Sequence, residues 1–375
     1  MLASVVVYAT QDRKDTGSYR IPIAVQFPWA IILGGGLFFL PDSPRYFVKK
    51  GNLVAAKDAL ARIRGQPEDS IYVQSELAEI VANEEYERAL IPSTTWFGSW
   101  AACFKGSLWT SNSNLRRTIL GTSLQMMQQW TGVNFIFYYS TPFLQSTGAI
   151  EDSFLMSMVF TLVNVFSTPL SFWTVERFGR RTILIVGAAG MLICQFIVAI
   201  IGVTVGFNHT HPDPEDPEKS IADNIAAVNA QVSFIAIFVF WFASTWGPGA
   251  WIVIGEIFPL PIRSRGVALS TASNWLWNTI IAVITPYMTE KADMKSTVFF
   301  VWGSLCTAAF VYTYFLVPET KGLTLEQVDK MMEETTPRTS AKWKPTTTFA
   351  SQVGTTGGYL DSSVIVDAER KSSAV

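Results

Sequence analysis

Amide side chains recur inside long apolar stretches of this 375-residue chain, where polar groups are costly. Gln125, Gln128 and Gln129 fall on one face of a helix at ~100° per residue, and Asn274 and Asn278 lie one turn apart in a later stretch. An amide donates and accepts hydrogen bonds without transferring protons, so its chemistry is ligand binding or helix–helix contact. The apolar stretches contain no nucleophile–base set and no cluster of metal ligands. We therefore expect no catalytic residue, cofactor or metal, and an enzyme is the least favoured class.

Asn134 follows the three glutamines but points away from Gln129 on a regular helix, by roughly 140°. Gly132 lies between them and Pro142 follows, so a break near Gly132 would return Asn134 to the glutamine face. The next apolar stretch carries a polar stripe at helical spacing, made of Ser157, Thr161, Asn164 and Thr168. Small polar stripes commonly hold membrane helices together, so packing is the favoured role for this one apart from Asn164.

Membrane-spanning helices must position these side chains. The chain is 49% hydrophobic and 15% charged. A helix needs about 20 residues to cross a hydrocarbon core of ~30 Å, and it must close its backbone hydrogen bonds internally. Seven stretches reach or approach that length: Ile21–Leu40, Ile119–Leu144, Phe154–Val175, Thr182–Val205, Val232–Ile257, Gly266–Met288 and Val298–Val317. Gly247-Pro248-Gly249 must bend or interrupt the fifth of them. The sequence thus predicts an all-α polytopic membrane protein.

Positive charge alternates between the loops that join these stretches. Lys and Arg are concentrated in the first long loop, in every second loop after it and in the tail, whereas 145–153 has none and 206–231 has only Lys219. Positive loops stay in the cytosol, so the chain starts outside and ends inside. Asn208 begins a glycosylation sequon in a loop assigned to the outside. A seven-helix receptor of the G-protein-coupled type has the same plan, so the helix count alone leaves both classes open.

Acidic and basic side chains recur at the cytosolic ends of several stretches. Any one of these motifs alone is explained by topogenic charge or helix capping. Together they predict a network that holds the helix ends and breaks when the protein changes state. Its expected members are Arg45, Glu176, Arg180, Arg181, Glu256, Arg263, Arg265 and Glu319.

Six motifs resemble, in order and spacing, those of the sugar porter family of the major facilitator superfamily, in particular fungal hexose transporters: PDSPRYFVKKG, QQWTGVNFIFYY, VERFGRR, WGPGAW…GEIFP, RSRG and PETKGLTLEQVD. The resemblance implies a partial major-facilitator fold, truncated at its N-terminus, with seven of twelve transmembrane helices. The implied parts are 1–20 (end of helix 5 and external loop), 21–40 (helix 6), 41–117 (cytosolic loop with intracellular helices), 118–317 (helices 7–12) and 318–375 (cytosolic tail). The intracellular helices are expected at Leu53–Arg64 and Ile71–Ala89, and disorder is expected after Pro337.

The resemblance implies transport of a monosaccharide, a hexose such as glucose, by alternating access across the plasma membrane. Amides would bind sugar hydroxyls, and aromatic rings would cover the C–H faces. The implied sugar contacts are Gln128, Gln129, Asn134, Asn164, Phe242, Trp251, Asn274, Trp275 and Asn278, and the implied gate residues are Tyr138 and Tyr139.

The expected partners are the sugar and the lipid bilayer, and the absence of a basic tract argues against nucleic acid. Proton coupling stays open, because the carboxylate that the resemblance links to it lies on family helix 1. Two alternatives also stay open: a sugar sensor on the same fold that does not transport, and an inactive fragment.

Overall fold

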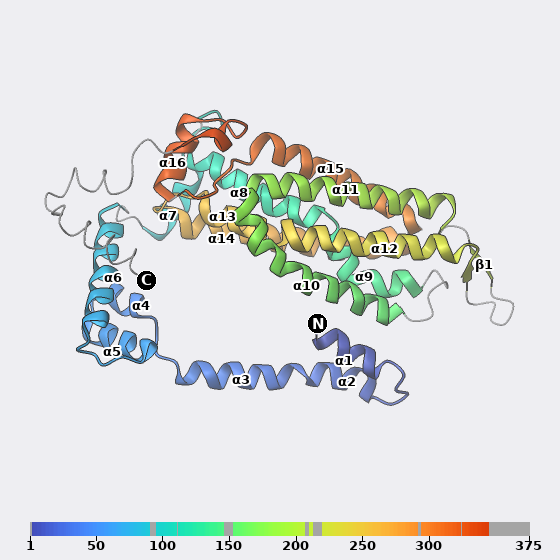
Figure 1. The fold of residues 1–375 in the computed structure, drawn as a ribbon, viewed down its shortest axis with the longest axis horizontal. Helices are drawn as coiled ribbons and strands as arrows, with labels where there is room; N and C mark the ends of the chain where they lie inside the picture. Colours follow the sequence, from blue (N-terminus) through green and yellow to red (C-terminus); the bar gives the residue numbers. More distant parts are fainter. Residues whose placement is uncertain are drawn as a thin grey trace, which may run out of the picture.

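The computed structural model describes residues 2–90, 95–110, 112–145, 153–206, 210–212, 220–291, 294–323 and 325–344. Figure 1 shows an elongated bundle of long helices, a group of short helices at one end and a separate N-terminal arm. The bundle consists of α8 (Asn114–Trp130), α9 (Val133–Gln145), α10 (Ser153–Phe178), α11 (Arg180–Thr204), α12 (Ile225–Trp241), α13 (Gly247–Glu256), α14 (Arg263–Pro286) and α15 (Val298–Leu316). Its closest pairs are α11 with α15, α8 with α14, and α11 with α12.

Six helices in the described residues are long and apolar enough to cross a membrane: Gly17–Phe39, Phe154–Phe178, Arg180–Thr204, Ile225–Glu256, Arg263–Thr289 and Val298–Leu316. The count differs from the seven predicted stretches because 119–144 forms two helices, α8 and α9, of 17 and 13 residues. Gly132 separates them with a φ of 81°, a left-handed conformation that favours glycine. The predicted helical, multi-pass membrane architecture is otherwise confirmed.

Close packing between α11 and the α12–α13 segment depends on a small residue. A Cβ atom placed on Gly187 of α11 would lie 2.0 Å from Oγ1 of Thr245. Thr245 belongs to a π-helical turn, Phe242–Trp246, that joins α12 to α13. Gly187 therefore lets α11 lie directly against this irregular turn, which is part of the candidate site.

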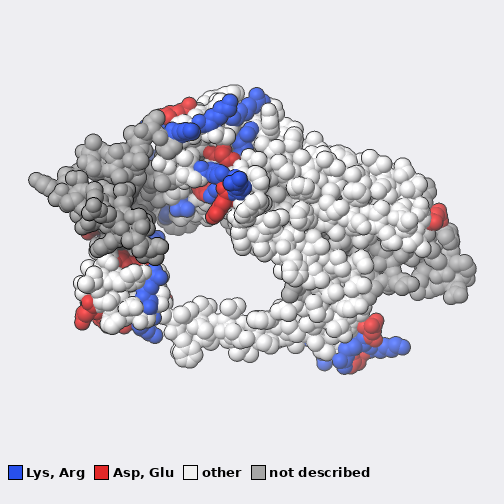
Figure 2. All heavy atoms as spheres, in the orientation of Figure 1, with Lys and Arg blue, Asp and Glu red and all other residues white. Residues whose placement is uncertain are grey.

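The N-terminal arm consists of α1 (Leu2–Thr10), α2 (Gly17–Ala24) and α3 (Gln26–Phe39). Helix α1 contacts α10, and Ser4 donates a hydrogen bond to Thr161 (3.3 Å). In contrast, α3 runs apart from the bundle, and Figure 2 shows an opening between them. No residue of α3 is buried, and Phe38 is 86% exposed. Within the described part of the chain, much of its apolar surface therefore stays uncovered by protein.

Short helices gather at the end of the bundle assigned to the cytosol: α4 (Pro44–Lys49), α5 (Leu53–Arg64), α6 (Ile71–Leu90), α7 (Trp96–Ala101) and α16 (Leu325–Glu334). The structure has helices at both predicted positions, α5 and α6. They pack through Leu60 and Val73, and the Arg64 guanidinium donates two hydrogen bonds to Glu76 (3.0 and 2.6 Å). This contact holds the pKa of the Glu76 carboxyl below its ordinary value.

Two features depart from the sequence predictions. A small antiparallel pair, β1 (Thr210–Pro212) and β2 (Ser220–Ala222), interrupts the otherwise helical chain. Disorder after Pro337 is wrong for 338–344, where Ser340 is 3% exposed and its Oγ accepts a hydrogen bond from the backbone N–H of Glu319 (2.8 Å). A buried hydroxyl with a partner anchors this segment, and composition alone did not reveal that contact.

Candidate functional site

Three buried amides on α8 and α14 hydrogen-bond to one another. Asn274 Nδ2 donates to Gln125 Oε1 and to Gln128 Oε1, both at 2.8 Å. Gln128 Nε2 donates to the backbone carbonyls of Trp246 (2.8 Å) and Gly247 (3.0 Å). These contacts join α8, α14 and the α12–α13 segment. Because a buried polar group is costly without a partner, the amides also lock the three elements together.

Gln125 carries a free donor inside this cluster. Its side chain is fully buried, and its Nε2 has no hydrogen-bond partner in the described part of the chain. An unmet buried donor costs free energy, so it can gain from a ligand oxygen.

The break at Gly132 places Asn134 as predicted from the sequence. Helix α8 ends at Trp130, α9 begins at Val133, and the Asn134 amide donates to Gln129 Oε1. Thr131 also donates to the Gln128 carbonyl (2.7 Å), which holds the junction in place. The break thus brings a second amide pair to the end of α8, next to the first cluster along the helix.

The predicted interruption at Gly247-Pro248-Gly249 is confirmed as the π-helical turn Phe242–Trp246, directly before α13. Pro248 has no N–H to donate within the helix, which favours such a change of winding. Trp246 is fully buried, and its Nε1 donates to the Leu184 carbonyl of α11 (2.8 Å). Phe242, at the start of the turn, is half-buried. The turn therefore presents carbonyl oxygens to Gln128 from a fixed position.

Three of the aromatic residues expected near the site are exposed: Trp251, Trp275 and Tyr138. Trp251 is 42% exposed and Trp275 is 63% exposed. Tyr139 donates its hydroxyl to the Ala282 carbonyl of α14 (2.8 Å), whereas Tyr138 is 53% exposed. The exposed rings of Trp251 and Trp275 are thus free to contact a ligand or a further protein wall.

Two expected sugar contacts are not bonded to the amide cluster. Neither the Asn164 nor the Asn278 side chain forms a hydrogen bond to it within the described residues. The neighbouring stripe serves packing, since Ser157 bonds Ser140 (3.0 Å) on α9. The predicted glycosylation residue, Asn208, lies outside the described residues.

A charge cluster joins α11, α13 and the segment after α15 at the end of the bundle assigned to the cytosol. Arg180 donates two hydrogen bonds to Glu256 (2.8 and 3.2 Å), and Thr320 donates to the same carboxylate (2.6 Å). Glu319 accepts from the backbone N–H groups of Arg180 (2.8 Å) and Arg181 (3.2 Å) at the positive N-terminus of α11. On the face drawn in Figure 2, charged side chains gather at this end and around α4–α6, with another group near α1 and α2.

Four expected members of the network have other surroundings. Arg263 donates to the Gly255 carbonyl (3.0 Å), and Arg265 donates to Ser264 (3.0 Å). Glu176 and Arg45 are exposed, and Arg45 lies on α4, away from α11. The structure thus brings together Arg180, Arg181, Glu256 and Glu319, and leaves these four outside.

Sequence reasoning missed a second charged contact. Arg117, at the start of α8, is 1% exposed, and its guanidinium contacts Asp329 of α16, Asn112 and the Ile257 carbonyl (3.0 Å). From the sequence, Arg117 was only one of the positive charges of the first long loop. The available signal was Asp329 itself, which lies within the motif PETKGLTLEQVD.

Comparisons with known proteins agree with this arrangement. The family model described as "Sugar (and other) transporter" matches residues 1–332. The major facilitator-type transporter ecdD of Aspergillus rugulosus is 42% identical over 350 residues, which cover 92% of this chain and 61% of that protein. The probable glucose transporter rco-3 of Neurospora crassa is 39% identical over 342 residues, covering 89% and 53%. This chain therefore spans little more than half the length of these relatives.

Among solved structures, the proton:xylose symporter XylE bound to 6-bromo-6-deoxy-D-glucose has a similar fold, with a TM-score of 0.64. The match has 24% sequence identity and covers 88% of this chain and 64% of XylE. At that sequence identity, the similarity supports a shared fold and nothing further. Because the family model spans most of the chain, and the fold agrees with it, the chain belongs to the sugar transporter family of the major facilitator superfamily.

Proposed function

We propose that this chain forms the C-terminal part of a plasma-membrane monosaccharide transporter that works by alternating access. The observation that carries the proposal is the buried amide cluster of Gln125, Gln128 and Asn274, which contains an unmet donor and lies against a π-helical turn. Sugar hydroxyls both donate and accept hydrogen bonds, and amides match them in both directions. The exposed ring of Trp251 offers an apolar face for the C–H side of the sugar.

The remaining assignments extend this proposal. Gln129, Asn134, Asn164, Phe242, Trp275 and Asn278 are proposed as further sugar contacts, and Tyr138 and Tyr139 as the external gate. Asn164 and Asn278 form no hydrogen bond to the amide cluster within the described residues, so they would contact the sugar independently of it. The parts 1–20, 21–40, 41–117, 118–317 and 318–375 are proposed as the domain organisation.

Uptake of labelled glucose tests the proposal directly. A chimera that joins the N-terminal helices of the Neurospora relative to this chain is expected to restore uptake in yeast that lacks hexose transporters. This chain alone is expected to give none, because within the described residues no part of α3 is buried and Trp275 is 63% exposed. The comparison is made at equal surface level, with and without a proton gradient, which separates coupled from uncoupled transport.

Two outcomes would contradict the proposal. One is a chimera that reaches the surface and binds sugar without moving it, as a sensor would. The other is uptake by this chain alone, which would show that the exposed site needs no second wall.

Replacing Arg180 by alanine in the chimera is expected to lower the maximal uptake rate about tenfold at unchanged surface level. Arg180 and Glu256 join helix ends that must be held in one facing state, and losing this contact biases the equilibrium between states. Arg64→Ala is the matched control, because Arg64 also donates two hydrogen bonds to one carboxylate but lies on α5. If the two substitutions lowered the uptake rate equally, the Arg180 contact would contribute only to general stability.

A further inference from the structure

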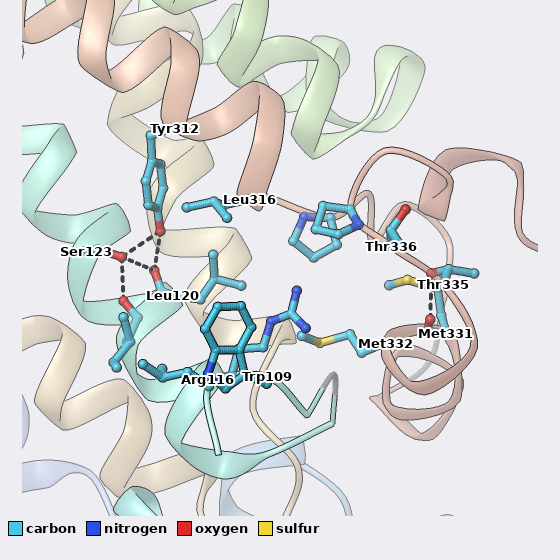
Figure 3. A pocket seen from close by; sticks show the side chains of 14 residues that line it. Trp109, Arg116, Leu120, Ser123, Tyr312, Leu316, Met331, Met332, Thr335 and Thr336 are labelled. Atoms are coloured by element: carbon cyan, nitrogen blue, oxygen red, sulfur yellow. Dashed lines mark hydrogen bonds between the residues drawn. The ribbon is translucent and has the colours of Figure 1, made fainter. Parts of the chain in front are cut away.

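We propose that a pocket at the cytosolic ends of α8 and α15 binds an anionic phospholipid of the cytosolic leaflet. The lipid phosphate would lie at Arg116, and one acyl chain would fill the pocket. The cavity has a volume of about 330 Å³ and is closed on its far side by α16 and the residues that follow it. Figure 3 shows Tyr312 and Ser123 at one end of the pocket, Met331–Thr336 at the other, and Arg116 and Trp109 between them.

The inner part of this pocket suits a hydrocarbon chain. Its walls are mostly apolar, and include Leu120, Leu316 and Met332. The two hydroxyls at one end of it already have partners: Ser123 and Tyr312 bond each other (2.7 Å), and Tyr312 donates to the Leu120 carbonyl (2.9 Å). A polar ligand would find few free hydrogen-bonding groups there, whereas an acyl chain needs no hydrogen bonds.

Arg116 supplies the charge that an anionic headgroup requires. Within the described residues its guanidinium takes part in no ion pair and no side-chain hydrogen bond. The next residue, Arg117, is in contrast buried and bound to Asp329. Guanidinium binds phosphate through two parallel hydrogen bonds, so the unpaired Arg116 is complementary to a phosphodiester.

The position of the pocket favours a lipid over a dissolved ligand. Ile119 and Leu316 line it and are 43% and 47% exposed, so the pocket opens onto the apolar flank that faces the bilayer. Trp109, at its edge, is 94% exposed, as expected of a ring at the membrane–water interface. The cytosolic leaflet carries the anionic lipids.

Native mass spectrometry of the whole chain, freed of lipid and titrated with phosphatidylserine or phosphatidylcholine, tests this inference. We expect preferential binding of phosphatidylserine, about fivefold weaker in Arg116→Ala. Leu316→Trp, which fills the pocket, is expected to lower binding of both lipids. Arg62→Ala removes the same charge from an exposed position on α5 and is expected to change neither.

A photoreactive acyl chain on phosphatidylserine locates the site. We expect labelled peptides within 108–123 and 331–337. The proposal is overturned if labelling falls elsewhere, if Arg116→Ala and Arg62→Ala have equal effects, or if glycerophosphoserine without acyl chains competes as well as the lipid. A Leu316→Trp protein that binds both lipids normally would also overturn it.

Discussion

Replacing Gln128 by alanine is expected to weaken sugar binding by roughly 5- to 150-fold, which corresponds to the cost of unmet buried polar groups. Gln128 has contacts on both sides: it donates to the carbonyls of Trp246 and Gly247, and it accepts from Asn274. Its removal deprives the sugar of an amide and leaves Asn274 with one acceptor fewer. The measurement is the apparent affinity for glucose uptake by the chimera, alongside its thermal midpoint in detergent.

A buried amide outside the site separates sugar binding from stability. Gln231 is fully buried on α12 and donates to the Val198 carbonyl (2.8 Å), so Gln231→Ala removes the same group at the same burial. We expect it to lower the thermal midpoint as much as Gln128→Ala while leaving glucose affinity near normal. If both variants lose affinity equally, Gln128 acts through stability and the assigned position of the sugar is wrong.

Gln125 shares a helix face with Gln128 and lies about one turn away, which would suggest it as a control. It cannot serve as one, because Asn274 donates to both glutamines. Helical spacing predicts which side chains share a face of a helix. The hydrogen-bond partner of each side chain depends on which other helix packs against that face. Asn274 is 146 positions from Gln128 in sequence, and nothing in the spacing of either helix relates them.

Local irregularities of the helices were more accessible to sequence reasoning. The glycine backbone adopts conformations that other residues avoid, and proline fixes φ and lacks an N–H. The breaks at Gly132 and before Pro248 could therefore be predicted without knowing the fold. Arg117 shows the opposite case. Its charge was visible in the sequence, but its burial depends on α16 covering the start of α8.

Replacing Asp329 by alanine is expected to destabilise the docking of α16 by about 3 kcal/mol, near the lower end for breaking a buried ion pair, because the Asp329 side chain is 38% exposed. Among the described residues, the substitution leaves the buried Arg117 guanidinium with two neutral acceptors, Asn112 and the Ile257 carbonyl. Hydrogen exchange of α16 is the measurement, and its protection should fall roughly 150-fold. The thermal midpoint of the whole bundle should fall less.

Lys330→Ala is the matched control. Lys330 is the next residue of α16 and forms a half-exposed ion pair with Glu334 (3.9 Å), a type of contact that contributes under about 1 kcal/mol. A double variant, Arg117→Leu with Asp329→Leu, removes both charges and should recover most of the lost protection, since two apolar side chains of suitable size pack without a desolvation cost. If α16 of the double variant were instead as weakly protected from hydrogen exchange as α16 of Asp329→Ala, the destabilisation would come from lost packing. An unpaired buried arginine would then not be its cause.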